Sequence, residues 1–322
     1  MGTTFRVSIF DENRKRAIEQ SEAMLRIVEE AENQLSTWRP GTELSQLNRM
    51  PPRRALPLNP PLCDLFLKVR DWVLLTGGAF DPAIGRVLHA WRIQGAGRIP
   101  DAVELTEALS QSGFNRLRIE NCTLTKDVDL WFDTGAFGKG EALDRVVAAA
   151  KERDFSPFLI DFGGQLAGWK APPERHGWDA RLAHPQDRTA TSAIEIVFPD
   201  GSISSSGGSE KDLIVEGRRV GHIVDPRTGS PCAAFGSVAV WNVSALAADI
   251  LSTALYVMGP EAGFRWAVDH QIAACFITSQ PPSTRITPAF QKLLPPHSRI
   301  GAEQSATSAS QSVKSAVSGT LP

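Results

Sequence analysis

Asp133-Thr-Gly-Ala-Phe-Gly-Lys-Gly140 leads into a strongly helical run at 140–153, and this turn is the most informative stretch of the chain. Glycines on a strand-to-helix turn let the backbone approach a ligand closely. The free N–H groups at the helix start, together with Lys139, favour a phosphate. The stretch has the spacing of neither a P-loop nor a GxGxxG turn. A Gly-rich turn required only by packing fits these residues equally well.

Outward from this turn, helical and strand-like segments alternate. Apolar spacing, caps and glycine stops predict helices at 11–35, 43–49, 60–76, 101–112, 140–153, 245–258 and 261–270. Strands are predicted at 1–10, 117–119, 123–126, 128–132, 157–162, 178–182, 193–198, 202–206, 212–215, 238–241 and 273–278. Strands in meander-like runs, interrupted by helices, favour an α+β fold over a doubly wound parallel sheet.

Composition excludes several classes of protein. The chain has 322 residues, of which 22% are charged and 42% hydrophobic, so it is neither a mini-protein, a collagen nor a wholly disordered chain. Its net charge of −2 predicts no attraction to nucleic acid or anionic membrane. No apolar run reaches about 18 residues, so no membrane span is expected.

The two ends of the chain differ in character. The first ten residues lack a basic region followed by an apolar one, so no signal peptide is expected as written, and the predicted location is cytoplasmic. From Gly301 the composition reduces to Ser, Ala, Thr, Gln and Val. We therefore expect one folded domain over 1–298 and a disordered Ser/Ala-rich tail over 299–322.

The four cysteines, Cys63, Cys122, Cys232 and Cys275, lie far apart and form no CxxC pair. This spacing favours buried small apolar residues over a disulfide framework or a zinc site.

A second group of polar residues lies in Gly221-His-Ile-Val-Asp-Pro-Arg-Thr-Gly229. His222 precedes an apolar pair and a rigid Asp-Pro turn, where it can take a proton from a hydroxyl near neutral pH. A structural histidine at a strand end is the alternative. Arg227 and Thr228 either hold phosphate or cap the turn.

A third group is Asp249 with Thr253, on the helix predicted at 245–258. A spacing of four places a carboxylate and a hydroxyl on one face, one turn apart. The rest of the helix is largely apolar, and a buried carboxylate needs a partner or a metal. Oxygen ligands suit Mg²⁺. Alternatively, Asp249 accepts backbone hydrogen bonds and Thr253 bonds back to a carbonyl.

Two aromatic residues lie in turns. Trp38 follows the first helix, and Phe80 lies in Gly77-Gly-Ala-Phe-Asp-Pro82. Either can stack on a planar ring or cover the core. Asp81 can accept from a ligand N–H or shape the turn.

These segments occur in a particular order: MGTTF, LSTWRPGTELSQLN, TGGAFDPAIG, DTGAFGKGEALDR, LIDFGGQLAGW, SSSGG, HIVDPRTGSP and LAADILSTAL. The combination resembles the FAD:protein FMN transferase family, the ApbE-type flavin transferases, from Met1 to about residue 290. The resemblance implies a mixed α+β fold of the duplicated T-fold type, with largely antiparallel sheets and packed helices.

The resemblance also implies an activity. A Thr or Ser hydroxyl of a target flavoprotein or redox-complex subunit attacks the FMN-side phosphorus of FAD, with Mg²⁺ on the pyrophosphate. FMN becomes linked through a phosphoester, and AMP leaves. The alternatives are an FAD pyrophosphatase that uses the same metal site and a non-catalytic flavin-binding protein.

Residue by residue, the resemblance implies three roles. The metal ligands are Asp249, Thr253 and the backbone carbonyl of Ala136, and His222 is the base that deprotonates the acceptor. The flavin-nucleotide contacts are Met1, Trp38, Ala79, Phe80, Asp81, Asp133, Lys139 and Ile223.

The chain departs from the family pattern at several positions. Trp38 replaces a frequent Tyr, Glu141 replaces a common aromatic residue, and SSSGG replaces a more usual Thr-Ser-Gly. Many members carry an export signal and a lipobox cysteine before the MGT segment, whereas here Met1 is itself that methionine. If a leader was removed, the expected location becomes periplasmic or lipid-anchored.

Overall fold

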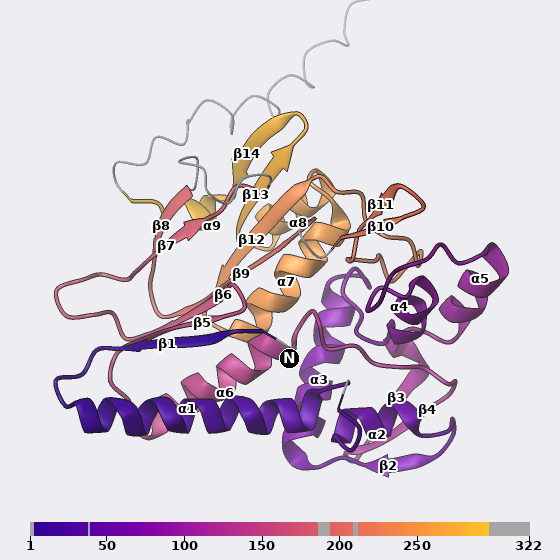
Figure 1. Ribbon diagram of the computed structural model, residues 1–322, viewed down its shortest axis with the longest axis horizontal. Helices are drawn as coiled ribbons and strands as arrows, with labels where there is room; N and C mark the ends of the chain where they lie inside the picture. Colours follow the sequence, from indigo (N-terminus) through magenta and orange to yellow (C-terminus); the bar gives the residue numbers. More distant parts are fainter. Residues whose placement is uncertain (1–2, 38, 186–193, 209–211, 296–322) are drawn as a thin grey trace, which may run out of the picture.

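A seven-stranded antiparallel sheet forms the centre of the molecule in this computed structural model, which describes residues 3–37, 39–185, 194–208 and 212–295 (Figure 1). Every neighbouring pair of its strands is antiparallel. In spatial order the strands are β1 (Phe5–Ile9), β5 (Phe158–Phe162), β6 (Gln165–Trp169), β9 (Gly201–Gly207), β12 (Gly236–Asn242), β13 (Ala273–Ser279) and β14 (Pro282–Ile286). The predicted α+β class is therefore confirmed.

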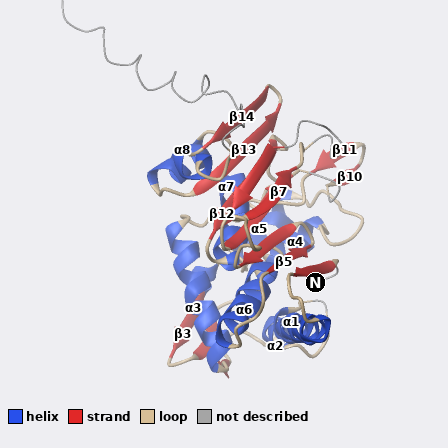
Figure 2. Ribbon diagram, turned by 90° about the vertical axis from the view of Figure 1, so that its left-hand side faces the viewer, coloured by secondary structure: helices blue, strands red, loops and turns tan. Residues whose placement is uncertain are grey.

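Helices cover one face of this sheet, namely α1 (Arg14–Leu35), α6 (Gly138–Glu152), α7 (Ala245–Met258) and α8 (Ala262–Asp269). Alternation along the strands explains the layering, because successive side chains point to opposite faces. Val238 and Val240 of β12 pack in the core with Leu251 of α7, whereas Ala239 packs on the other face. Figure 2 shows α1 and α6 beside one another beneath the strands.

The second face is closed by a hairpin and a short helix. The hairpin consists of β7 (Trp178–Leu182) and β8 (Ile194–Phe198), and α9 spans Pro288–Gln291. Phe198 and Phe290 pack there against Ile203 and Cys275 of the sheet.

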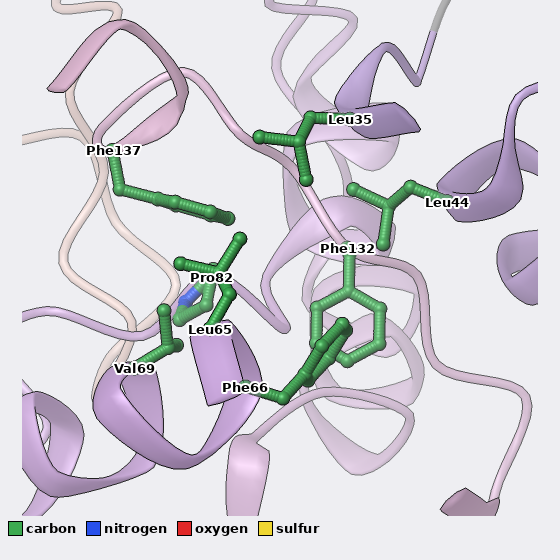
Figure 3. A pocket seen from close by; sticks show the side chains of 8 residues that line it. All are labelled: Leu35, Leu44, Leu65, Phe66, Val69, Pro82, Phe132 and Phe137. Carbon is green, nitrogen blue, oxygen red and sulfur yellow. The ribbon is translucent and has the colours of Figure 1, made fainter. Parts of the chain in front are cut away.

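A smaller helical unit lies beside the sheet. It contains α2 (Glu43–Arg49), α3 (Pro60–Leu75), α4 (Gly85–Trp91), α5 (Ala102–Ser110) and a three-stranded sheet of β2 (Ala55–Pro57), β4 (Thr123–Lys126) and β3 (Leu117–Glu120). Its core holds a cavity of about 10 Å³, room for one water, lined by Leu35, Leu44, Leu65, Phe66, Val69, Pro82, Phe132 and Phe137 (Figure 3). Because the lining side chains are all apolar, the cavity offers no polar partner to a ligand or to water.

Two cysteines correct the sequence prediction. Cys63 of α3 and Cys122, in the turn between β3 and β4, form a disulfide with their Cα atoms 5.4 Å apart. The prediction of unpaired buried cysteines is wrong for this pair, because packing of α3 on the small sheet joins residues 59 apart in the sequence. Cys275 is buried and free and Cys232 is half-buried and free, as expected.

Other differences arise where local signals are weak. Residues 128–132, predicted as a strand, are irregular. Asn48 of α2 provides a substitute strand partner, since its side chain donates to the Phe132 carbonyl at 3.0 Å and accepts from the Phe132 N–H at 2.7 Å. The unpredicted α4 begins at Gly85, and its N-cap residue, Ile84, makes no side-chain cap. Strands β6 and β14 were not predicted, nor was β11 (Arg218–Val220), which pairs with β10 (Leu213–Val215).

Within the described ranges, no helix has both the length and the apolar character needed to cross a membrane.

Candidate active site

The N-terminus of α6 is capped by a residue from another helix. Phe137, which precedes α6, makes no side-chain cap, so the first N–H groups of the helix need other acceptors. Asp249 of α7 accepts from the Gly140 N–H at 3.1 Å, although only 3% of Asp249 is exposed. The Gly-rich turn found in the sequence therefore meets Asp249 directly.

The capping is reciprocal, because α6 also caps α7. Asp144 accepts from the backbone N–H groups of Ala245 at 2.6 Å and Leu246 at 3.1 Å, and from the Ser244 hydroxyl at 2.6 Å. Burial raises the pKa of the Asp144 carboxyl, and these hydrogen bonds oppose that shift. Two carboxylates thus hold the two helix starts against each other.

Gly140 makes this close approach possible. A Cβ at this position would lie 2.4 Å from the Ala245 carbonyl oxygen and 2.7 Å from the Leu246 Cα, which no side chain tolerates. The glycine therefore has a packing role, which is one of the two explanations raised by the sequence for this turn.

Asp249 is surrounded by polar partners. Its carboxylate accepts from the Lys139 ammonium at 3.2 and 3.4 Å and from the Ser204 hydroxyl at 3.2 Å. Thr253, one turn further on, bonds the Asp249 carbonyl at 3.3 Å and contacts the Ser206 hydroxyl at 3.1 Å. Ser204 and Ser206 lie on the same face of β9, since side chains two apart share a face.

This set of atoms fits a hard cation. It consists of one carboxylate and several hydroxyl oxygens, donor types that suit Mg²⁺ and not a soft metal. In the described part of the chain, no three or more His, Cys, Asp or Glu side chains cluster as a metal site. The Lys139 ammonium lies against the same carboxylate. The hydrogen bonds of the non-metal alternative are also present, from Gly140 to the carboxylate and from Thr253 to the carbonyl.

The turn before α6 is tied to the Phe80 segment. Asp133 donates its N–H to the Pro82 carbonyl at 2.8 Å. Its carboxylate accepts from the Gly135 N–H at 2.8 Å and the Gln94 side chain at 2.9 Å, and burial raises its pKa. Ala136, half-buried on the same turn, packs against the core of the helical unit.

The AFDP segment is largely buried. Ala79 is 1% exposed and Phe80 is 2% exposed, and the Phe80 ring meets Phe137 edge to face at 6.2 Å. Asp81 accepts from the N–H groups of Ala83 and Phe114, both at 2.8 Å, and burial raises its pKa. The Asp81 oxygens therefore shape this turn, the second of the two roles expected for them.

His222 has a buried carboxylate as its partner. Its ring Nδ1 lies 2.8 Å from Asp212 Oδ1, and its backbone N–H donates to the same oxygen at 3.2 Å. The Asp212 side chain is only 2% exposed. Ile223 packs in the core beside α7. Asp212 was missed from the sequence, because its only signal is an isolated acid ten residues before the histidine.

Strand β9 connects this pair to the Asp249 group. Ser204, Ser206 and Gly208 are spaced two apart and share one face of the strand and its continuation. A Cβ on Gly208 would lie 3.2 Å from Asp212 Oδ2. Asp212, the partner of His222, therefore lies next to the residue that follows β9.

The Asp-Pro turn after His222 is internally bonded. Asp225 accepts from the backbone N–H of Arg227 at 2.9 Å and from its guanidinium at 2.9 and 2.8 Å. The Thr228 hydroxyl accepts from the Ser230 N–H at 3.3 Å. Both residues thus cap the turn as it stands. A Cβ on Gly78 would lie 3.7 Å from Arg227 Cγ, which brings this turn beside the AFDP segment.

Comparison with known proteins agrees with this arrangement. The profile of the ApbE family matches residues 1–276. This chain belongs to the ApbE family. An ApbE-family relative, the FAD:protein FMN transferase of Klebsiella pneumoniae (strain 342), is 29% identical over 310 residues, which are 91% of this chain and 87% of that protein. The FAD:protein FMN transferase of Vibrio cholerae serotype O1 is 29% identical over 297 residues, 86% and 85% of the two chains.

Solved ApbE structures share the fold. The apo form of the flavinyl transferase ApbE of Pseudomonas stutzeri superposes with a TM-score of 0.81 at 27% identity, over 91% of this chain and 94% of that chain. The flavin transferase ApbE from Vibrio cholerae gives 0.79 at 26% identity, over 91% and 96%. The family predicted from the motif order is confirmed.

Two residues that the ApbE resemblance assigns to the flavin, Met1 and Trp38, lie outside the described residues, as does the tail predicted over 299–322. Among the described residues, the structure brings together Lys139, Asp249 and Thr253, with Ala136 on the turn before α6, while His222 is paired with Asp212.

Proposed function

We propose that this chain transfers FMN from FAD to a Thr or Ser hydroxyl of an acceptor flavoprotein or redox-complex subunit and releases AMP. The observation that carries the proposal is the convergence of Asp249, Thr253 and Lys139 at the start of α6, with the His222–Asp212 pair next to Gly208 at the end of β9. The printed names of the ApbE relatives support the same reaction.

The start of α6 suits a pyrophosphate. The positive end of the helix dipole favours anions, and Lys139 adds a positive charge there. Asp249, Thr253 and the Ala136 carbonyl would hold Mg²⁺, which when bound would neutralise part of the phosphate charge. Phosphoryl transfer depends mainly on such positioning and charge balance. The seven-stranded sheet and α7 keep these side chains in place.

His222 would serve as the base. With its Nδ1–H directed at Asp212, its Nε2 carries the free lone pair. The acceptor oxygen forms a bond to the FMN-side phosphorus, the bond to the AMP oxygen breaks, and Nε2 takes the hydroxyl proton. AMP leaves with the electrons of the broken bond.

The test is a flavinylation assay. Purified protein is incubated with FAD, Mg²⁺ and Ser/Thr/Gly/Ala-rich acceptor peptides, and we expect covalent flavin fluorescence on a peptide together with an equal amount of AMP. AMP with free FMN, whether or not a peptide is present, would indicate hydrolysis instead. No AMP under any condition would indicate a non-catalytic flavin-binding protein.

Asp249→Asn tests the role of the carboxylate. The amide keeps the shape and can still accept from Gly140, but it lacks the charge that balances a cation. We expect turnover to fall by about 10²-fold or more while FAD affinity changes much less. Asp144→Asn is the matched control, since it removes the other capping carboxylate of the same junction, and it should keep most of the turnover. Unchanged turnover of Asp249→Asn at limiting Mg²⁺ would contradict the assignment.

A further inference from the structure

Asp212 is a buried carboxylate to which neither the motif analysis nor the family resemblance assigns a role. We infer that Asp212 is the positioning residue for His222, holding its ring in one tautomer and one orientation and stabilising the imidazolium that forms when Nε2 takes the proton. The inference rests on the proposed role of His222 as base.

The hydrogen bonds fix the tautomer. Asp212 Oδ1 lies 2.8 Å from the ring Nδ1 and accepts the His222 backbone N–H at 3.2 Å. An ionised carboxylate only accepts, so the ring nitrogen facing it must carry a proton. Nε2 is then left with its lone pair, as a general base requires. Because one oxygen holds both the backbone and the ring, the side chain has little freedom to rotate.

The second oxygen of Asp212 is held as well. Oδ2 accepts from Arg219 Nε at 2.9 Å. A Cβ on Gly208 would lie 3.2 Å from this oxygen and equally 3.2 Å from the Tyr256 hydroxyl, so Asp212 and Tyr256 both lie beside Gly208. Only 2% of the Asp212 side chain is exposed. Its carboxylate is therefore held by Arg219 and His222 in a buried position next to the end of β9.

The position and the charge of Asp212 together explain why a carboxylate is needed here. Thr253 and Tyr256 are three apart on α7 and share a helix face. Because Tyr256 and Asp212 both lie beside Gly208, the Asp212–His222 pair is near the face of α7 that carries Thr253. A neutral side chain of similar size would fill the space, but it would not select the Nδ1–H tautomer or balance the charge of the imidazolium.

The experiment compares four variants in the flavinylation assay: Asp212→Asn, His222→Asn, the double variant and Asp11→Asn. In Asp212→Asn the amide can donate to Nδ1 and so favour the wrong tautomer. We expect kcat for FMN transfer to fall by about 10²-fold or more while KM for FAD stays within about threefold. In the double variant, Asp212→Asn should add no further loss to that of His222→Asn.

Asp11→Asn is the matched control. Asp11 is another carboxylate with a side chain only 1% exposed, and it accepts from an arginine Nε, that of Arg16, at 2.5 Å at the start of α1. We expect its kcat to stay within about threefold of the wild type. An equal loss of kcat in this variant would mean that removing any buried, arginine-paired carboxylate lowers kcat, which would overturn the inference.

The outcomes separate the inference from the function on which it rests. If His222→Asn keeps its rate, the base role itself is wrong. If His222→Asn loses transfer but Asp212→Asn stays within about threefold, or adds its full loss in the double variant, only the positioning role is wrong. Nitrogen-15 NMR of the histidines gives a readout independent of turnover, since the His222 signals should show Nδ1–H in the wild type and not in Asp212→Asn.

Discussion

Lys126 is completely buried, yet its ammonium group has a full set of partners. It donates to the carbonyls of Leu47 at 3.0 Å, Asn48 at 3.2 Å and Leu130 at 3.1 Å. An ammonium has three donors, so three carbonyls saturate it. Burial lowers the pKa of Lys126 to about 8. One side chain thus joins the end of α2 to the irregular segment that follows β4.

Lys126→Met should be strongly destabilising. Methionine fills a similar volume but removes the donor that three carbonyls share. The Leu47 carbonyl keeps the Met50 N–H at 3.2 Å, whereas each carbonyl left unsatisfied costs about 1–3 kcal/mol. We expect the free energy of unfolding to fall by about 3 kcal/mol or more, measured by urea denaturation. The exposed Lys151→Met on α6 is the control and should change stability by no more than about 0.5 kcal/mol. Equal urea midpoints for wild type and Lys126→Met would contradict this account.

At the scale of elements, the junction of α6 and α7 matters most. Each helix start is capped by a carboxylate of the other, Asp249 for α6 and Asp144 for α7. The same junction places Asp249 beside Lys139 and β9. A change in the distance between the helices must therefore alter both stability and the proposed metal site.

Gly140→Ala tests this coupling. The added Cβ would meet the Ala245 carbonyl oxygen at 2.4 Å, so the helices must move apart. Overpacking of this kind costs about 1–3 kcal/mol, and we expect a lower Tm together with a higher Mg²⁺ requirement for FMN transfer. In Gly95→Ala, the control, the new Cβ would lie 3.7 Å from the Arg92 carbonyl oxygen, an ordinary contact, and Tm should hardly change. A Gly140→Ala enzyme with wild-type Tm and Mg²⁺ response would show that the junction is not tight.

At the scale of the whole molecule, the Cys63–Cys122 disulfide bears on where the protein works. Disulfides persist in oxidising compartments and are rare in the reducing cytosol. The redox state of this pair therefore distinguishes the two locations expected from the sequence, cytoplasmic as written and periplasmic or lipid-anchored if a leader was removed.

We therefore expect two of the four cysteines to be oxidised in cells. Acid quenching followed by alkylation with a mass-tagged maleimide under denaturing conditions should label two thiols, Cys232 and Cys275. Prior treatment with reductant should raise the count to four. Four labelled thiols without reductant would show that the chain is kept in a reducing compartment.

Much of the fold was predictable, because its signals are local. The helix Ala245–Met258 agrees at both ends with the prediction from its Ser244 cap and Gly259 stop, and Ser244 accepts from the Ala247 N–H at 3.1 Å. Strand β4 also agrees at both ends. At Phe132 the residue pattern predicts a strand, but the backbone N–H and C=O bond to the Asn48 side chain instead of a neighbouring strand.

By itself, the sequence determined most of the elements, the family and the chemical types at the site: a carboxylate and a hydroxyl one turn apart, a Gly-rich turn and a histidine before an Asp-Pro turn. Only the tertiary structure decided which groups meet. Gly140 donates a hydrogen bond to Asp249, 109 residues away in the sequence, and Cys63 forms a disulfide with Cys122, 59 residues away. Asp212 becomes the partner of His222 because its segment folds back beside β9 and α7. Caps and periodicity act within a few residues, whereas such pairings depend on how whole elements pack, which no local pattern encodes.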